Sequence, residues 1–326
     1  MRNARRFFLM LILACLLLTG CMTGGGTDDP DTKWVSLSDA PALPESLKTN
    51  GSDVPTLKVY DVSKKKIVEM DLEEYVEGVV AGEMKNDWPI EALKAQSILA
   101  RTFVLKFCDS KKSRYDGADI STDVSEAQAY APENINDRIR QAVEETRGIV
   151  MVSDGEYPQA WFFAHSGGKT ELPSVALDYS QGDPEYLRVT ESPDSDKAPD
   201  SVKEWTATFT KDEVQKACAD SGLKVDAINT VEIGERGESG RAKTLKINGS
   251  EVSAPSFRIN IGANRLKSTL VRETTVNGDE VIFSGSGFGH GVGMSQWGAY
   301  GLAEQGESAE QIVEYYFSGV GLAKMW

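Results

Sequence analysis

One carboxylate in this sequence lies where its proton affinity should be unusual. Apolar residues recur at helical spacing from Leu72 to Val80, and the same spacing continues to Glu83. A carboxyl group on the apolar face of a helix is disfavoured as an anion, so we expect a raised pKa for Glu83. Such a group can act as the general acid that protonates a glycosidic oxygen near neutral pH. The alternative is that the helix ends before Gly82, leaving Glu83 as a solvated end residue.

Two cations follow on the next predicted helix, which begins at Pro89 and runs to about Phe107. Lys94 and Arg101 are seven residues apart and therefore share one helical face. If this face turns toward Glu83, the two cations could orient sugar or acetamido oxygens, or steady the carboxylate after proton transfer. The pattern alone favours the alternative, an ordinary amphipathic helix with exposed cations.

A polar cluster, His165, Ser166, Gly167 and Gly168, follows a predicted strand over residues 157–164. The paired glycines predict a tight turn that lets a ligand approach the backbone. The glycine and lysine spacing of a phosphate-binding loop is absent. A serine-hydrolase site is also excluded, because His165 and Ser166 are adjacent and no Gly-x-Ser-x-Gly pattern surrounds them.

Glycine stands at every second position from Gly285 to Gly293. Such a segment loses the side chains along one edge of its backbone, which allows close approach of a ligand or of another chain segment. His290, one of two histidines in the protein, lies inside it, and we take it as a candidate functional residue. The alternatives are a structural histidine, and glycines at 298 and 301 that simply let the following helix pack closely.

The elements that must position these residues are helices and strands in mixed order, which predicts an α+β fold. We expect a mixed helical and antiparallel-strand core with a central cleft, as one large domain or two lobes. The sequence shows no internal repeat. The predicted strands are 56–61, 66–71, 148–153, 157–164, several within 225–253, and 281–284. The predicted helices are 71–84, 89–107, 136–146, 211–221 and two closing helices, the second opened by a capping box at Ser308.

The start of the chain predicts export and a lipid anchor. Three arginines precede a short apolar run, Phe7–Leu18, which is typical of a signal peptide over residues 1–20. Leu-Thr-Gly-Cys21 is the lipobox pattern of bacterial lipoproteins, in which the cysteine is acylated; the alternative is an uncleaved anchor helix. Residues 21–54 then form the lipidated Cys21 and a flexible tether, and residues 55–326 form the globular domain. We expect a lipid-anchored protein on the extracytoplasmic side of the cell membrane.

The formal net charge is −15, and removal of the leader with its three arginines takes it to −18. Phosphate contacts need lysine and arginine, so this acidity argues against nucleic acid as a partner. Cys108 and Cys218 remain in the mature chain. They could pair in an oxidising compartment, but a buried free thiol is at least as well supported for Cys108.

Four motifs in this chain resemble the stage II sporulation protein D and amidase-enhancer family. They are Glu-Tyr-Val-Glu-Gly-Val-Val-Ala-Gly-Glu-Met (74–84), Ile-Glu-Ala-Leu-Lys-Ala-Gln-Ser-Ile-Leu-Ala-Arg-Thr (90–102), Ser-Gly-Gly-Lys-Thr (166–170) and Gly-His-Gly-Val-Gly-Met-Ser-Gln-Trp-Gly-Ala-Tyr-Gly-Leu-Ala (289–303). They occur in the order of the family and span nearly all of the chain after the tether.

The resemblance implies a peptidoglycan lytic transglycosylase without a cofactor. Such an enzyme cleaves between N-acetylmuramic acid and N-acetylglucosamine in glycan strands already stripped of stem peptides by an amidase, as in sporulation engulfment. The muramoyl 6-hydroxyl displaces the leaving sugar, so one carboxyl serves as acid and then base. The family's catalytic glutamate corresponds to Glu83, and its lysine and arginine to Lys94 and Arg101. The expected substrate-binding residues are Lys94, Arg101, His165, Ser166, Gly167, Gly168, His290, Ser295, Gln296 and Tyr300.

Two departures from the family pattern matter. Some members bind a metal through cysteine and histidine in the segment matching residues 119–130, which here has neither residue, so we expect no zinc. The lipobox replaces the transmembrane anchor of sporulation members and favours a general wall-remodelling role. The alternative function is a non-catalytic, glycan-binding enhancer of an N-acetylmuramoyl-L-alanine amidase. An active enzyme requires Glu83 buried in a cleft with Lys94, Arg101 and His290 nearby, whereas the enhancer would keep full function as Glu83→Gln.

Overall fold

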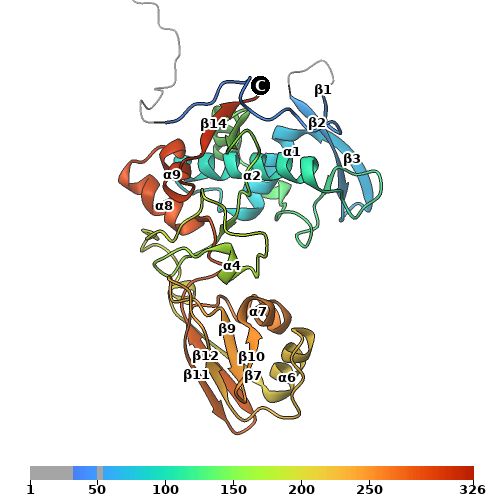
Figure 1. Cartoon of the computed structure of the whole chain (residues 1–326). Helices are drawn as coiled ribbons and strands as arrows, with labels where there is room; N and C mark the ends of the chain where they lie inside the picture. Colours follow the sequence, from blue (N-terminus) through green and yellow to red (C-terminus); the bar gives the residue numbers. More distant parts are fainter. Residues whose placement is uncertain (1–31, 50–53) are drawn as a thin grey trace, which may run out of the picture. The chain divides into compact units, whose positions relative to one another are not determined.

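The computed structural model describes residues 32–49 and 54–326, which form a mixed α+β fold of the predicted class (Figure 1). These residues contain two hydrophobic cores. One is built from both the N-terminal half and the C-terminal end of the chain, and the other from residues 205–283. The predicted signal peptide, Cys21 and residues 22–31 and 50–53 of the predicted tether lie outside the described residues.

The first core includes a small sheet built on the predicted hairpin. Strand β2 (Pro55–Asp61) pairs antiparallel with β3 (Lys66–Asp71). Alternate β2 side chains are buried, as the two-residue period of a strand requires. The Asp61 carboxylate holds the turn by accepting hydrogen bonds from the backbone N–H groups of Ser63 (2.9 Å) and Lys64 (3.0 Å). The short strands β1 (Lys48–Thr49) and β4 (Ile120–Ser121) both pair with β2.

Two predicted helices, α1 (Leu72–Glu83) and α2 (Ile90–Ser110), lie at the centre of the first core. The apolar residues that recur at helical spacing in α1 are all fully buried: Leu72, Tyr75, Val76, Val79 and Val80. Pro89 is the N-cap of α2 rather than its first helical residue, so the helix begins at Ile90, one position later than predicted. Four further elements pack around α2: α3 (Asp137–Glu145), β5 (Ile149–Val152), α8 (Gln296–Gln305) and α9 (Ala309–Tyr316). Figure 1 labels α8 and α9 beside α2.

Part of the predicted tether is held against the first core. The Val35 N–H donates to the Leu322 carbonyl (2.8 Å), and the Leu322 N–H donates to the Lys33 carbonyl (2.9 Å). Leu322 lies in β14 (Gly321–Lys324), which pairs antiparallel with β5. Strand β1 adds a second attachment through its pairing with β2. Residues 32–49 are therefore part of the fold, because long-range backbone pairing does not require an apolar periodicity in the added segment.

The second core is inserted between two short strands of the first, β6 (Phe162–Phe163) and β13 (Met294–Ser295), which pair in parallel. It holds two antiparallel three-stranded sheets, ordered β11-β12-β7 and β10-β9-β8, and two helices. Its elements are β7 (Trp205–Thr210), α6 (Lys211–Asp220), β8 (Val231–Ile233), β9 (Thr244–Ile247), β10 (Ser250–Ser253), α7 (Ala254–Gly262), β11 (Val271–Asn277) and β12 (Glu280–Gly285).

Local signals placed most helix starts correctly. Reciprocal capping boxes open α6 at Thr210 and α9 at Ser308, and the Asn136 side chain caps α3. The predicted strand over 157–164 is reduced to β6, and β14 follows the two closing helices. The remaining short elements are a 3₁₀ turn (Pro132–Asn134), α4 (Pro173–Ala176) and α5 (Asp200–Lys203). Among the described residues, no helix is both long and apolar enough to cross a membrane.

Candidate active site

Glu83 is the last residue of α1, and two glycines on that helix bring another segment against it. A Cβ at Gly82 would lie 2.7 Å from the carbonyl carbon of Ala129, and one at Gly78 would lie 2.2 Å from the Tyr130 ring. The absence of side chains there lets residues 129–130 cross the helix closely. The Ala129 N–H consequently reaches Glu83 and donates to its Oε1 at 2.7 Å.

The Glu83 carboxyl has a raised pKa, as its position on the apolar face predicted. Burial is the largest cause, because it removes water from the charged form. The Ala129 N–H and the side-chain amide of Gln296 act in the opposite direction by hydrogen bonding to the carboxylate. The side chain is partly covered rather than solvated, although the helix does end at Glu83. The group can therefore hold a proton at a higher pH than an exposed glutamate.

Glu83 lines a cleft of about 590 Å³. Trp88 and Trp297 line the same cleft, with their ring centroids 4.4 Å apart, and Tyr300 packs against both tryptophans. The full lining consists of Ala81, Gly82, Glu83, Met84, Lys85, Asn86, Asp87, Trp88, Asn134, Ala164, Pro199, Val202, Phe288, Gln296 and Trp297. Aromatic walls beside amides, a carboxyl group and the charged side chains of Lys85 and Asp87 are a composition suited to a polar ligand with apolar faces, such as a sugar.

Lys94 is not among the residues that line this cleft. Its ammonium group forms ion pairs with Glu91 at 2.8 Å and with Glu145 on α3 at 2.5 Å. Burial alone would lower the pKa of Lys94, but the two carboxylates outweigh it and the pKa is raised. The side chain thus joins α2 to α3 and does not meet Glu83 in this structure.

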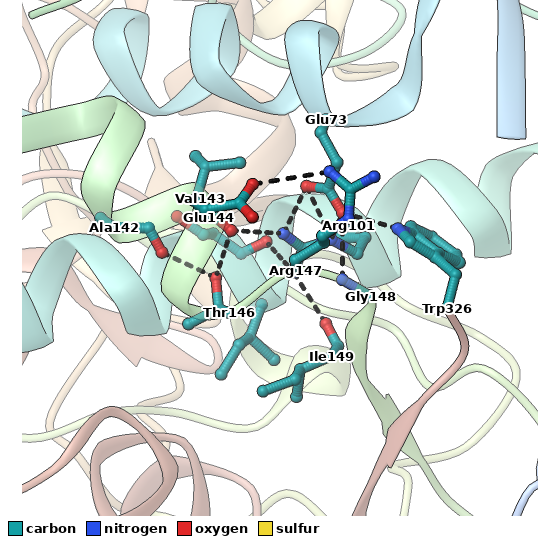
Figure 2. Close-up of polar contacts among 12 residues, drawn as sticks. Glu73, Arg101, Ala142, Val143, Glu144, Thr146, Arg147, Gly148, Ile149 and Trp326 are labelled. Atoms are coloured by element: carbon teal, nitrogen blue, oxygen red, sulfur yellow. Dashed lines mark hydrogen bonds and ion pairs between the residues drawn. The ribbon is translucent and has the colours of Figure 1, made fainter. Parts of the chain in front are cut away.

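Arg101 is fully buried in a network that Figure 2 shows. Its Nη2 donates to Glu73 Oε2 at 2.6 Å and its Nη1 to the Ile149 carbonyl at 2.8 Å. Glu73 Oε1 also accepts from the Gly148 N–H (3.0 Å) and the Trp326 indole (2.9 Å). Glu73 is ten residues before Glu83, about 15 Å along the helix. The predicted substrate contact of Arg101 is therefore not supported, because its donors are used inside the core.

The cluster 165–168 is organised by Asp194, which sequence reasoning missed. Asp194 Oδ2 accepts from the Ser166 hydroxyl (2.6 Å) and from the Ser166 and Gly167 N–H groups (2.8 and 3.2 Å). Its Oδ1 accepts from the Ser295 hydroxyl at 2.6 Å. Burial lowers the pKa of His165 despite the nearby Asp194 charge. His165, Ser166, Gly167 and Gly168 do not line the Glu83 cleft, and they act as its supporting framework instead.

His290 is also outside the cleft lining. Its Nδ1 accepts from the Val292 N–H at 3.0 Å, and burial together with Arg258 and Arg241 lowers its pKa to about 3. Gly291, next to His290, leaves room for the Arg241 side chain rather than for a ligand. A Cβ at Gly291 would lie 2.1 Å from Nε of Arg241, a fully buried residue whose Nη2 donates to the Ser166 carbonyl at 2.6 Å.

The last predicted residues divide between framework and cleft. Ser295 caps α8 by accepting from the Gly298 N–H at 3.2 Å, and this cap places Gln296 as the first helical residue. Gln296 lines the cleft and hydrogen-bonds to Glu83. Tyr300, one turn later, joins the tryptophan cluster. Of the predicted site residues, the structure thus brings Glu83 and Gln296 into contact. Tyr300 packs against the two tryptophans of the same cleft.

Neither Cys108 nor Cys218 lines the cleft. Cys108 and Cys218 are both free, and burial raises their pKa values to about 12 and about 11. Within residues 32–49 and 54–326, no group of three or more His, Cys, Asp or Glu side chains is placed to hold a metal. The expectation that the protein takes no zinc stays a prediction.

The fold and this cleft define an α+β protein with a carboxyl group suited to acid–base chemistry. The family model described as "Stage II sporulation protein" matches residues 60–152, which include Glu83, and a domain model of unknown function matches residues 180–293.

Curated relatives cover most of the chain. Stage II sporulation protein D of Bacillus subtilis is 31% identical, over 92% of this chain and 87% of its own length. The protein of the same name from Bacillus amyloliquefaciens is 32% identical, over 85% and 83%. The Amidase enhancer of Bacillus subtilis is 28% identical, over 76% of this chain and 40% of its own length.

The chain belongs to the stage II sporulation protein D family, as its motifs predicted. Membership of this family supports a function related to the cell wall.

Proposed function

We propose that this protein is a lytic transglycosylase that cleaves N-acetylmuramic acid–N-acetylglucosamine bonds in glycan strands free of stem peptides. The observation that carries the proposal is the raised pKa of Glu83, caused by its burial in a cleft walled by tryptophans. Because its proton is held to a higher pH than that of an exposed glutamate, this carboxyl is suited to donate a proton to a sugar–sugar oxygen. The expected setting is wall remodelling downstream of an amidase that removes the stem peptides.

The reaction needs one carboxyl group in two successive roles. Glu83 donates its proton to the glycosidic oxygen, so the bond from the muramoyl anomeric carbon breaks and the leaving sugar departs as an alcohol. The muramoyl 6-hydroxyl oxygen bonds to the anomeric carbon, and its proton passes to the Glu83 carboxylate. The product carries a 1,6-anhydro ring, and the enzyme regains its starting protonation. No water is consumed, which distinguishes this reaction from hydrolysis with two carboxylates.

Neighbouring hydrogen-bond donors support the ionised intermediate state of Glu83. The Ala129 N–H and the Gln296 amide both favour the carboxylate form. Hydrogen bonds to an ionised acceptor are stronger than those between neutral partners. These two groups supply the stabilisation that the sequence suggested for Lys94 and Arg101.

The second candidate function is a non-catalytic glycan-binding module that enhances an amidase. The name of one relative, Amidase enhancer, is the observation that favours it, although this chain spans only 40% of that protein. The cleft could hold glycan in either case. The two functions differ in whether Glu83 must transfer a proton.

The deciding experiment is product analysis by mass spectrometry on peptide-free glycan. We expect anhydro-muramoyl products from the wild-type protein and at least about a hundredfold slower release from Glu83→Gln, the range typical of a lost general acid. Glu77→Gln is a matched control, because Glu77 lies on the same helix, has a pKa raised mainly by burial, and does not line the cleft. Its activity should stay within about twofold.

Two outcomes would contradict the proposed lytic transglycosylase activity or the role of Glu83 in it. Absence of anhydro products with folded wild-type protein would favour the binding module. Equal rates for Glu83→Gln and wild type would remove Glu83 from the mechanism, whatever the product.

A further inference from the structure

The region matched by the domain model of unknown function contributes to the cleft that holds Glu83. Pro199, Val202 and Phe288 lie within residues 180–293 and line the cleft, whereas Glu83 comes from the other matched region. We propose that residues 180–293 supply a sugar-holding wall of this cleft, with Phe288 as the aromatic platform on which a pyranose ring stacks. This assignment rests on the proposed function for the identity of the glycan.

Phe288 is the least buried of the three aromatic side chains that line the cleft, the others being Trp88 and Trp297. Trp88 and Trp297 also line the cleft but are only 6% and 8% exposed, because they cover each other and Tyr300. Phe288 is only half-buried. A pyranose ring has apolar C–H groups on its faces, which pack on the electron-rich face of an aromatic ring. A phenyl ring that lines the same cleft as the Glu83 carboxyl can therefore supply the apolar contact for a pyranose ring.

The backbone that carries Phe288 is fixed on both sides. Phe288 exchanges two hydrogen bonds with His165, at 2.8 and 2.9 Å. Gly287 donates to the Val202 carbonyl and Gly289 to the Lys267 carbonyl, both at 2.9 Å. Both glycines have positive φ (79° and 108°), a conformation that strains other residues. The hydrogen bonds of Gly287, Phe288 and Gly289 thus fix the backbone that carries the ring.

The ring is also anchored from the inserted region. Lys267 places its ammonium 6.0 Å from the Phe288 ring centroid and donates to the Ser201 carbonyl at 2.6 Å. The Trp205 indole donates to the Gly287 carbonyl at 2.9 Å. The backbone of residues 287–289 is therefore already ordered before a sugar binds, which favours binding. The insertion would then serve the cleft directly.

Binding can be tested without turnover in the Glu83→Gln background. The probe is peptide-free glycan prepared with an amidase, and the dissociation constant is measured by calorimetry. Phe288→Leu keeps an apolar side chain but removes the ring, and we expect about tenfold weaker binding, equivalent to about 1.4 kcal/mol. Phe288→Tyr keeps the ring and should bind within about twofold. Ile259→Ser, at an exposed position of α7 in the same matched region, should bind as the parent does.

Each result decides the assignment. The assignment of Phe288 is overturned if Phe288→Leu is folded by circular dichroism and binds glycan as tightly as the parent. It is also overturned if Phe288→Leu and Phe288→Tyr weaken binding equally, or if the parent binds no glycan. The proposed reaction is tested separately. If binding depends on the ring but the wild-type protein releases no anhydro product, the reaction fails and the wall assignment stands.

Discussion

At the scale of single residues, Glu83 illustrates how a site can oppose stability. Its folded-state pKa is raised, so the folded protein holds the proton more tightly than the unfolded chain does. Below the ordinary glutamate pKa the carboxyl is neutral in both the folded and the unfolded protein, and the favourable contribution of Glu83 to folding is fully present. As pH rises through the raised folded pKa, the buried anion must form, and the contribution of Glu83 to folding becomes unfavourable.

This sign predicts how Glu83→Gln changes thermal stability. Glutamine stays neutral, so the melting temperature of the variant relative to wild type should increase as pH rises from 4 to 8. Thermal melts monitored by circular dichroism at several pH values measure the difference. Glu77→Gln should show the same direction, because burial also raises the pKa of Glu77. If the melting temperature of Glu83→Gln relative to wild type instead decreases as pH rises, the folded protein stabilises the Glu83 anion.

At the scale of elements, the Arg101–Glu73 pair adds a buried ionic link between segments that also pack together in the first core. It links the start of α1 to the middle of α2, and through Gly148 and Trp326 it reaches the turn before β5 and the end of the chain (Figure 2). Both side chains are buried, so each charge depends on the other for compensation. The family resemblance suggests a substrate contact for Arg101, whereas the network assigns it to the core.

We therefore predict that Arg101→Met destabilises the protein by about 3–5 kcal/mol, because Glu73 is left as a buried charge without its partner. Urea denaturation of the single variant and of Arg101→Met/Glu73→Leu measures this. The double variant should recover most of the loss, since both charges are removed together. A single variant that is as stable as wild type but inactive on peptide-free glycan would return Arg101 to a direct role in the site.

At the scale of the whole molecule, the cleft depends on regions that are far apart in the sequence. Glu83 comes from the first matched region, Phe288 from the second, and Gln296 from the helix that follows the insertion. The lipobox at Cys21 predicts a lipid anchor on the extracytoplasmic side of the membrane. We propose that the protein works on glycan close to an extracytoplasmic membrane surface.

The anchor can be tested by Cys21→Ser in cells labelled with a radioactive fatty acid. We expect loss of the label and release of the protein from the membrane fraction, with the cleavage rate of the purified protein unchanged. Cys108→Ser is the control, because Cys108 is a free thiol within the fold and should not affect membrane association. Membrane retention of unlabelled Cys21→Ser would point instead to an uncleaved N-terminal helix.

The sequence alone determined the features that depend on near neighbours along the chain. The apolar stripe of α1 and the place of Glu83 at its end follow from helical spacing, and the β2–β3 pair and the capping boxes at Thr210 and Ser308 follow from short-range hydrogen bonding. The raised pKa of Glu83 was predictable for the same reason, since its own helix indicates a buried face.

The tertiary structure decided which distant groups meet. Arg101 finds Glu73 twenty-eight residues away, and Asp194 joins Ser166 to Ser295 across more than a hundred positions. No local pattern indicates such partners, because a charged or hydroxyl side chain has the same sequence signature whether it meets solvent, substrate or another buried group. Packing removed Lys94 and Arg101 from the cleft and added Phe288 to it, whereas Gln296, which the family motif had predicted as a site residue, does lie beside Glu83.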